Sequence, residues 1–264
     1  YCSLAFYGMD SSIARTRASA AAERAAALAP GVADVHAALG LYAAWLAFDW
    51  ETAEREFQAA IEANPSYALA YIWYGMLLAA LSRHDEAIVL TSRAQEVDPL
   101  SPYANTALGL AQVQAGRRTE ALPALEESIN IDADFLYSLW VLGSIYGALG
   151  RYEEAVAVLE KAVTLSGRGS YYLSWLGWAY GVAGRKPEAE KILYELTAEI
   201  SNEDIQPVFM MQVCSGLGDL DSAFEWLEKS VVRGDPAASF IGFPPMDSLR
   251  EDPRFDGIRT LLGL

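Results

Sequence analysis

The sequence is poor in the residues that build catalytic and metal-binding sites. It contains two histidines and two cysteines among 264 residues. The run His84-Asp85-Glu86 combines a histidine with carboxylates, which could suggest a metal ligand or an acid–base pair. A glutamate recurs at the place of Glu86 every 34 residues, however, which is expected in the first turn of a helix, where the helix dipole favours a carboxylate. The sequence therefore predicts no catalytic residue, no metal site and no cofactor, and hence a protein that is not an enzyme.

Basic residues are also scarce. The 19 lysines and arginines face 35 aspartates and glutamates, which gives a formal net charge of −16. Nucleic-acid binding needs a basic surface that displaces counterions, and anionic membranes attract basic segments, so neither partner is expected. The longest uncharged run, residues 63–82, is interrupted by Asn64-Pro65 and Gly75 and is interpreted as a buried helix. The charge favours a neutral or basic protein or peptide as partner.

The two cysteines, Cys2 and Cys214, lie far apart in the sequence and are not expected to pair. That pattern suits a reducing compartment and predicts a cytoplasmic protein, with the periplasm as the alternative if the parent protein is anchored to a membrane. The chain begins with YCSLAFYGMD, without a signal-peptide pattern, and is expected to be a piece of a longer protein.

What the sequence has in abundance is a 34-residue period, counted here in units that start at residues 34, 68, 102, 136, 170 and 204. Glycine recurs at position 8, alanine at position 20, and mostly glycine at position 15. The members of position 8 are Gly75, Gly109, Gly143 and Gly177; those of position 20 are Ala53, Ala87, Ala121, Ala155, Ala189 and Ala223; those of position 15 are Ser82, Gly116, Gly150, Gly184 and Gly218.

Each recurring residue type has a physical reason. Small residues at positions 8 and 20 let two helices approach closely, where larger side chains would clash. Glycine at position 15 adopts the left-handed conformation that ends a helix. Pro65 and Pro99, both at position 32, end the second helix of a unit. The period therefore predicts a pair of helices in every unit.

The pattern Leu139-x-x-Leu142-Gly143-x-x-Tyr146, followed by Ala155 and Leu159, resembles the tetratricopeptide repeat (TPR). The resemblance implies an all-α fold, a right-handed superhelical solenoid of antiparallel helix pairs. We expect one solenoid domain over residues 1–264, with a partial repeat over 1–30, six units over 31–237 and a C-terminal capping helix within 238–264. The first complete unit departs from the pattern by one extra residue, because Gly40 precedes Ala53 by thirteen positions.

A second resemblance concerns the segments FDWETAEREFQAAI and FPPMDSLREDPRFDGIRTLLGL. They are similar to the C-terminal TPR regions of bacterial multidomain signalling proteins, which follow winged-helix regulators, nucleotide cyclases or Ser/Thr kinase domains. This resemblance implies a regulatory context for the chain.

TPR proteins commonly bind ligands on the surface formed by the first helices of their units, at positions 2, 5, 9 and 12 or 13. At these positions the sequence has no lysine, arginine or asparagine that could grip a carboxylate, and it predicts an aromatic and apolar groove. The predicted groove residues are Leu69, Ile72, Met76, Tyr103, Thr106, Leu110, Gln114, Tyr137, Trp140, Ser144, Tyr171, Ser174, Trp178, Ile205, Val208 and Gln212.

Three hypotheses for function follow from this groove. The first is a non-catalytic scaffold that binds a peptide or protein segment. The second is a sensory module of a larger signalling protein, whose groove binds a small apolar ligand or a neighbouring domain. The third is self-association, with the terminal helix of one copy in the groove of another. A separate ladder of arginines at position 16 is interpreted either as helix-end contacts or as an anion-binding edge, and comprises Arg83, Arg117, Arg151 and Arg185.

Overall fold

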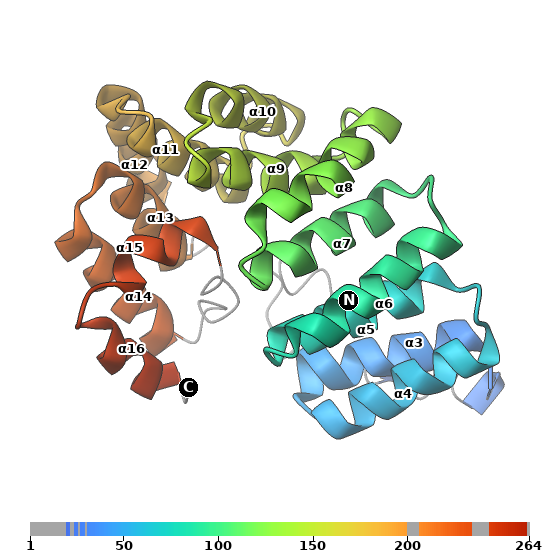
Figure 1. Cartoon of the computed structure of the whole chain (residues 1–264). Helices are drawn as coiled ribbons and strands as arrows, with labels where there is room; N and C mark the ends of the chain where they lie inside the picture. The colour runs from blue at the N-terminus through green and yellow to red at the C-terminus, as the bar shows by residue number, and fades with distance from the viewer. Residues whose placement is uncertain are drawn as a thin grey trace. The chain divides into compact units, whose positions relative to one another are not determined.

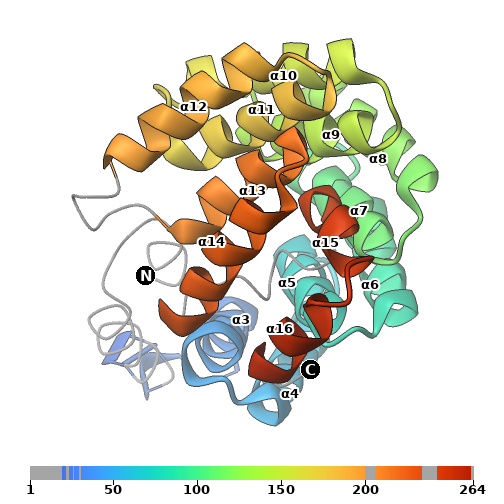
Figure 2. The ribbon, with the colours of Figure 1, turned by 90° about the vertical axis from the view of Figure 1, so that its left-hand side faces the viewer.

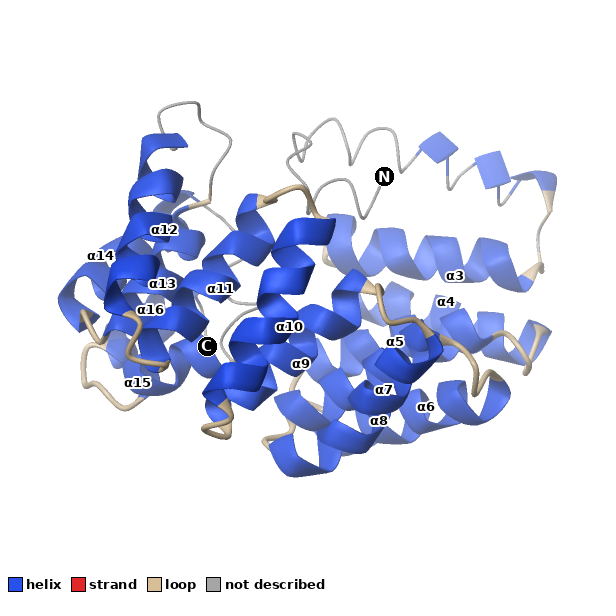
Figure 3. Cartoon of the chain, turned by 90° about the horizontal axis from the view of Figure 1, so that it is seen from above, coloured by secondary structure: helices blue, strands red, loops and turns tan. Residues whose placement is uncertain are grey.

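The computed structural model describes residues 20–21, 24–25, 27–29, 31–199, 206–233 and 243–262. All regular elements in these residues are helices, and no strand occurs among them (Figure 3). The chain divides into two compact units, residues 1–115 and 116–264, and each is described by itself. Within the described part of the chain, each helix is too short or too polar to cross a membrane.

Unit 1 consists of helices joined by short turns (Figure 1). Helix α3 packs against α4, α5 packs against α6, and α7 packs against α5 and α6. The elements are α3 (Ala33–Tyr42), a π-helical turn (Ala43–Ala47), α4 (Trp50–Ala63), α5 (Ala68–Ala80), α6 (His84–Val97) and α7 (Pro102–Gln114).

Unit 2 continues the same pattern with three hairpins and then ends in short helices (Figure 2). Helix α9 pairs with α10, α11 with α12, and α13 with α14, while α11 also packs against α9 and α13. The elements are α8 (Arg118–Ile131), α9 (Leu136–Ala148), α10 (Tyr152–Leu165), α11 (Ser170–Val182), α12 (Lys186–Glu199), α13 (Pro207–Leu217), α14 (Leu220–Arg233), a 3-10 turn (Pro244–Met246), α15 (Asp247–Arg250) and α16 (Phe255–Leu262).

The glycines at position 8 lie where two helices touch, as predicted. A Cβ atom on Gly143 of α9 would lie 2.5 Å from Cγ of Leu159 on α10, and one on Gly75 would lie 2.7 Å from Cγ2 of Thr91. A side chain at these points would overlap its neighbour, so the close approach depends on glycine. The alanines at position 20 complete the contact, since each of the six has no exposed surface.

The residues at position 15 end the first helix of each pair with a left-handed backbone, which confirms the reason given for glycine there. The φ angle is 61° at Ser82 and 76° or 75° at the four glycines, Gly116, Gly150, Gly184 and Gly218. Phe48 occupies the same position in the first complete 34-residue repeat, with φ of 56°, although it carries a bulky side chain.

The extra residue of this first repeat is accommodated by the π-helical turn Ala43–Ala47. Wider hydrogen bonding in the turn is evident at its end, where the backbone N–H groups of Phe48 and Asp49 both donate to the carbonyl of Ala43. A π-helical turn accommodates one more residue than an α-helical turn without breaking the helix. The contact at Gly40 is thereby kept, and a Cβ atom there would lie 2.7 Å from the ring of Phe57.

These contacts confirm the predicted fold class, an all-α repeat built from antiparallel helix pairs. The predicted partial repeat over residues 1–30 lies largely outside the described residues. In the region predicted as a cap, the described residues 243–262 form the 3-10 turn, α15 and α16.

Candidate functional site

In unit 1, four of the predicted groove residues keep exposed surface. Leu69, Met76, Tyr103 and Gln114 are half-buried, and the first three pack on a core cluster that contains the fully buried Ile72. The phenol O–H of Tyr103 donates to Sδ of Met76, 3.6 Å away. This pair joins α7 to α5. The half-buried ring and thioether form a mostly apolar surface there.

Two further predicted residues of α7 lie inside the unit. Thr106 is fully buried, and its Oγ1 donates to the carbonyl of Pro102 over 2.7 Å. Leu110 is also buried. A threonine hydroxyl that bonds its own helix has no proton left for a ligand, so Thr106 and Leu110 support the surface from below.

In unit 2, the predicted aromatic residues meet in one cluster. The ring of Trp140 on α9 lies 5.3 Å from the rings of both Tyr137 and Tyr171, measured between centroids. Trp175, which was not among the predicted residues, lies 5.4 Å from Trp140. Its position in the repeat predicts ordinary helix packing, and it is indeed fully buried. Only its spacing of one helical turn from Tyr171 could have suggested that it joins the cluster.

The fifth ring of this aromatic cluster comes from the C-terminal segment. Phe243 lies 5.3 Å from Trp140 and 5.7 Å from Trp175. It is only 3% exposed, and Trp140 is only 5% exposed. Around Trp140, the first-helix face of unit 2, formed by α9, α11 and α13, is therefore covered by the chain's own Phe243, whereas Tyr137 and Tyr171 stay half-buried. The sequence offered one signal for this, a phenylalanine followed by two prolines after the last repeat.

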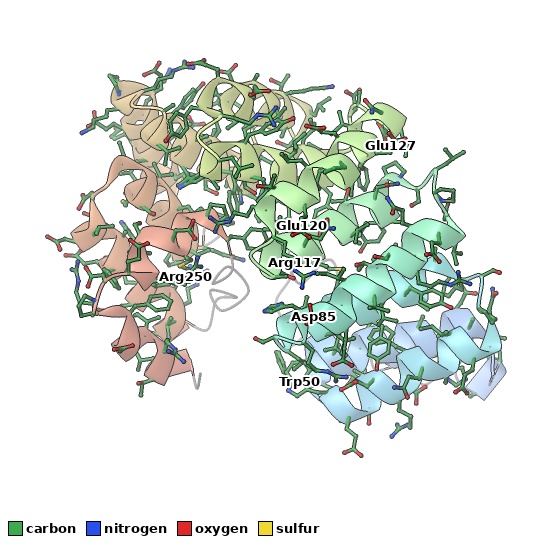
Figure 4. The ribbon with its side chains drawn as sticks, in the orientation of Figure 1. Trp50, Asp85, Arg117, Glu120, Glu127 and Arg250 are labelled. Atoms are coloured by element: carbon green, nitrogen blue, oxygen red, sulfur yellow. The ribbon has the colours of Figure 1, made fainter. Side chains whose placement is uncertain are left out.

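Polar contacts tie the C-terminal segment, residues 243–250, to α13 and to α8. The hydroxyl of Ser215 on α13 donates to the carbonyl of Pro245. Arg118 of α8 forms an ion pair with Asp247 over 2.7 Å, and Arg250 of α15, labelled in Figure 4, pairs with the same carboxylate. Both sequence-distant anchors, Ser215 and Arg118, belong to unit 2.

The remaining predicted residues of unit 2 are buried. Ser144 bonds its own helix through the carbonyl of Val141, and Val208 has no exposed surface. Trp178 lies between α9 and α11, because a Cβ atom on Gly147 would come within 2.6 Å of its ring. The structure thus places Trp178 in helix packing rather than on an open surface, and the reason is the space above Gly147. Ile205 lies outside the described residues.

Two polar groups of the face are buried without a partner among the described residues. Trp140 Nε1 has no acceptor there. Gln212 bonds Ser174 across 2.6 Å through one end of its amide, and the other end has no partner in the described part of the chain. The oxygen and nitrogen of the Gln212 amide can be exchanged by a flip, but only one of them reaches Ser174 in either arrangement. The other amide atom therefore stays unpaired in both arrangements. Unpaired buried groups of this kind are rare in folded proteins and call for an explanation.

In the arginine ladder, carboxylates pair with Arg83, Arg151 and Arg185. Arg151 forms two hydrogen bonds to Glu154 and stacks on Tyr146, 4.0 Å from the ring centroid. The hydrogen bonds from Arg151 hold the pKa of Glu154 below its usual value. The same arrangement recurs one period later, where Arg185 bonds Glu188 and stacks on Tyr180. These partners neutralise the two guanidinium groups, which disfavours the anion-binding interpretation. The expected contacts to helix carbonyls are made by the backbone, since the N–H groups of Arg151 and Arg185 donate to the carbonyls of Tyr146 and Tyr180.

Burial and the carboxylate of Glu160 act on Tyr180 of this arrangement. Burial raises the pKa of Tyr180, and the phenol's 2.6 Å hydrogen bond to Glu160 raises it further, to about 12.

The described residues contain no group of three or more histidine, cysteine, aspartate or glutamate side chains that could hold a metal ion. His36 bonds Glu56 over 2.7 Å. Cys214 is free and buried.

Comparison with known proteins identifies the repeats. Family models described as tetratricopeptide repeat match residues 47–96 and 136–168. No curated protein matches the sequence.

Several solved structures share the fold at low sequence identity. One is the APC/C hetero-tetramer Cut9–Hcn1, with a TM-score of 0.66 and 18% identity over 85% of this chain and 45% of the other. This chain therefore spans less than half of that protein. PilW, a type IV pilus biogenesis factor, has a TM-score of 0.61 and 17% identity, with 76% and 93% covered. A thermophilic TPR protein of Thermus thermophilus has a TM-score of 0.56 and 18% identity, with 75% and 98% covered. The repeat period, the helix pairs and these matches agree that the chain contains tetratricopeptide repeats.

Proposed function

We propose that this protein is a non-catalytic scaffold that binds a peptide or protein segment on the first-helix faces of its repeats. TPR proteins are generally protein–protein interaction scaffolds, and helical repeats use such extended surfaces for recognition. One observation carries the proposal for this chain. The first-helix face of unit 2 already holds a short segment, residues 243–250, through an aromatic ring and polar contacts.

The chemistry of this face is suited to peptide recognition. Aromatic pairs contribute about 0.5–1.5 kcal/mol beyond the area that they bury, and tryptophan and tyrosine are enriched at interface hot spots. Trp140 has three ring partners in unit 2 besides Phe243. In unit 1, Tyr103 and Met76 offer an aromatic ring and a flexible thioether at the surface, and methionine adapts well to varied apolar partners.

The net charge of the chain distinguishes acidic from basic partners. The net charge of −16 repels acidic segments and attracts basic ones, mainly by changing the rate of encounter. We therefore propose a neutral or basic partner. Raising the salt concentration should slow association with a basic partner and leave a neutral one unaffected.

The test selects peptides from a random library on the intact chain and measures their affinity by calorimetry. Tyr103→Ala should weaken binding by a factor of ten or more. Tyr194→Ala is the matched control, because Tyr194 is 78% exposed on α12, a second helix. Peptides that bind both variants as tightly as the parent would contradict the proposal for the first-helix face of unit 1, to which Tyr103 belongs. A failure to select any peptide would contradict it as well.

Self-association is a second candidate, favoured by the position of Phe243. A segment that is bound within one chain can be exchanged for the same segment of another copy. Light scattering over a range of concentrations tests this. A dimer that dissociates when Phe243 is replaced by alanine would support it, and a monomer at all concentrations would exclude it.

A further inference from the structure

We propose that residues 243–250 act as an internal ligand of unit 2, and that the partner of this face is an extended segment carrying an aromatic residue followed by prolines, which displaces them. The inference rests on the proposed function, because it names the partner class and the regulation of the same face. Two features support it, namely the way in which the segment is held and the buried indole N–H of Trp140, which has no acceptor among the described residues beneath Phe243.

The segment is bound mainly by side chains. Its regular structure is limited to the 3-10 turn Pro244–Met246 and the four-residue helix α15. Phe243, the two prolines, Met246 and Leu249 are nevertheless buried. A short segment of this kind resembles a bound peptide more than a repeat helix, since it is held by a few inserted side chains.

The internal segment is an imperfect ligand. The ring of Phe243 lies against Trp140, whose Nε1 is buried without an acceptor among the described residues. Each buried and unpaired polar group carries its full desolvation penalty, which a better ligand would remove. A proline-rich strand fits this requirement, because its carbonyl oxygens are free acceptors and it has few N–H donors of its own to satisfy.

The far end of the segment is held by an ion pair and by Leu249, whose side chain is fully buried. Arg118 and Asp247 form an ion pair over 2.7 Å, with side chains 24% and 34% exposed. A partly exposed ion pair is a weak anchor that salt screens. Release of the segment therefore requires loss of this ion pair and withdrawal of Phe243 and Leu249 from their contacts, and the helices α9, α11 and α13 remain folded.

The test measures whether the face accepts the segment when it is supplied as a separate molecule. A fluorescent peptide of sequence FPPMDSLR, identical to residues 243–250, is titrated into the intact 264-residue chain and followed by anisotropy. The Phe243→Ala protein should bind it at least ten times more tightly than the parent, whose own segment competes. The peptide APPMDSLR should bind neither protein, because it lacks the ring.

A second variant covers the case in which Phe243→Ala fails to fold, as judged by circular dichroism. Asp247→Asn removes the ion pair and leaves the aromatic cluster intact, so it should bind the peptide several times more tightly than the parent. Equal affinity of the parent and the folded variants, or no binding to any of them, would overturn the internal-ligand proposal.

The two proposals fail in distinguishable ways. If library peptides bind through Tyr103 while FPPMDSLR binds no variant, the scaffold function stands and the internal ligand does not exist. If FPPMDSLR binds the Phe243→Ala protein while no library peptide binds the parent, the internal ligand stands and the open face of unit 1 is not a binding surface. A parent dimer that becomes monomeric in Phe243→Ala would show the segment bound to a second copy, and would overturn its assignment as an internal ligand.

Discussion

The ring of Phe243 lies against the ring of Trp140, with 5.3 Å between centroids and planes tilted by 33°. The two residues are about a hundred positions apart in the sequence of unit 2, and one belongs to a repeat while the other follows the repeats. Their contact covers part of the first-helix face of unit 2, the face that we propose as a binding surface. The C-terminal segment therefore lies on the proposed surface itself.

The contribution of this contact to stability should be smaller than that of an ordinary buried phenylalanine. Phe224 of α14 is 4% exposed, similar to Phe243, but it lies within a repeat helix. Phe224→Ala should lower the free energy of unfolding by about 3–5 kcal/mol. Phe243→Ala should cost roughly half of that or less, because a segment that can detach limits the loss to its own docking free energy. Urea unfolding of both variants measures the difference, and equal costs would mean that the segment is an integral part of the core.

Replacing Gln212 by methionine should leave stability unchanged or raise it by up to about 1 kcal/mol. Methionine keeps the length of the side chain and removes an amide end that has no partner among the described residues. Ser174 keeps a hydrogen bond, since its Oγ also lies 2.7 Å from the carbonyl of Tyr171. Thermal unfolding provides the measurement. A loss of more than about 1 kcal/mol would indicate that the amide is fully satisfied in solution.

The helix contact at Gly143 should not tolerate a side chain. Gly143→Ala places Cβ against Leu159 and should destabilise the protein by about 1–3 kcal/mol through overpacking. Combining it with Leu159→Ala removes the overlapping atoms, so the double variant should be more stable than the sum of the two single effects predicts. Additive effects in this double-mutant cycle would show that the two residues are not in contact.

Alkaline pH should weaken the protein through Tyr180. Its pKa is raised to about 12 in the folded state by burial and by Glu160, compared with 10 for an unperturbed tyrosine. Between these values the unfolded chain releases a proton that the folded chain retains, so stability that is complete below about pH 10 is lost as the pH rises towards about 12.

Tyr180→Phe is the control for this pH dependence. Without the ionisable phenol, the free energy of unfolding should fall less steeply between about pH 10 and pH 12, as measured by urea titrations at several pH values. Identical slopes for the parent and the variant would contradict the raised pKa.

Much of the fold is predictable from the sequence because it repeats. The glycines at positions 8 and 15 and the alanines at position 20 have the same local reason in each unit, and one period predicts the next. The π-helical turn at Ala43–Ala47 is harder to predict, since the extra residue near Gly40 could equally have formed a longer loop.

The candidate site is less predictable, because the decisive contact lies outside the period. Trp140 and Tyr171 follow from their repeat positions, but nothing in the 34-residue pattern relates either of them to Phe243. The exposed fraction of a side chain also depends on the residues packed around it and not only on its position in the repeat. Trp178 has a groove position in the repeat, yet it is 3% exposed because Gly147 on the adjacent first helix leaves room for its ring.

The central claim is that Phe243 occupies the first-helix face of unit 2 in solution. Its most direct test is a nuclear Overhauser spectrum of the intact protein with protonated phenylalanine and tryptophan in a deuterated background. The account predicts cross-peaks between the ring protons of Phe243 and the indole protons of Trp140, which disappear in Phe243→Leu. A spectrum in which Trp140 shows contacts to its repeat neighbours but none to Phe243 would contradict it.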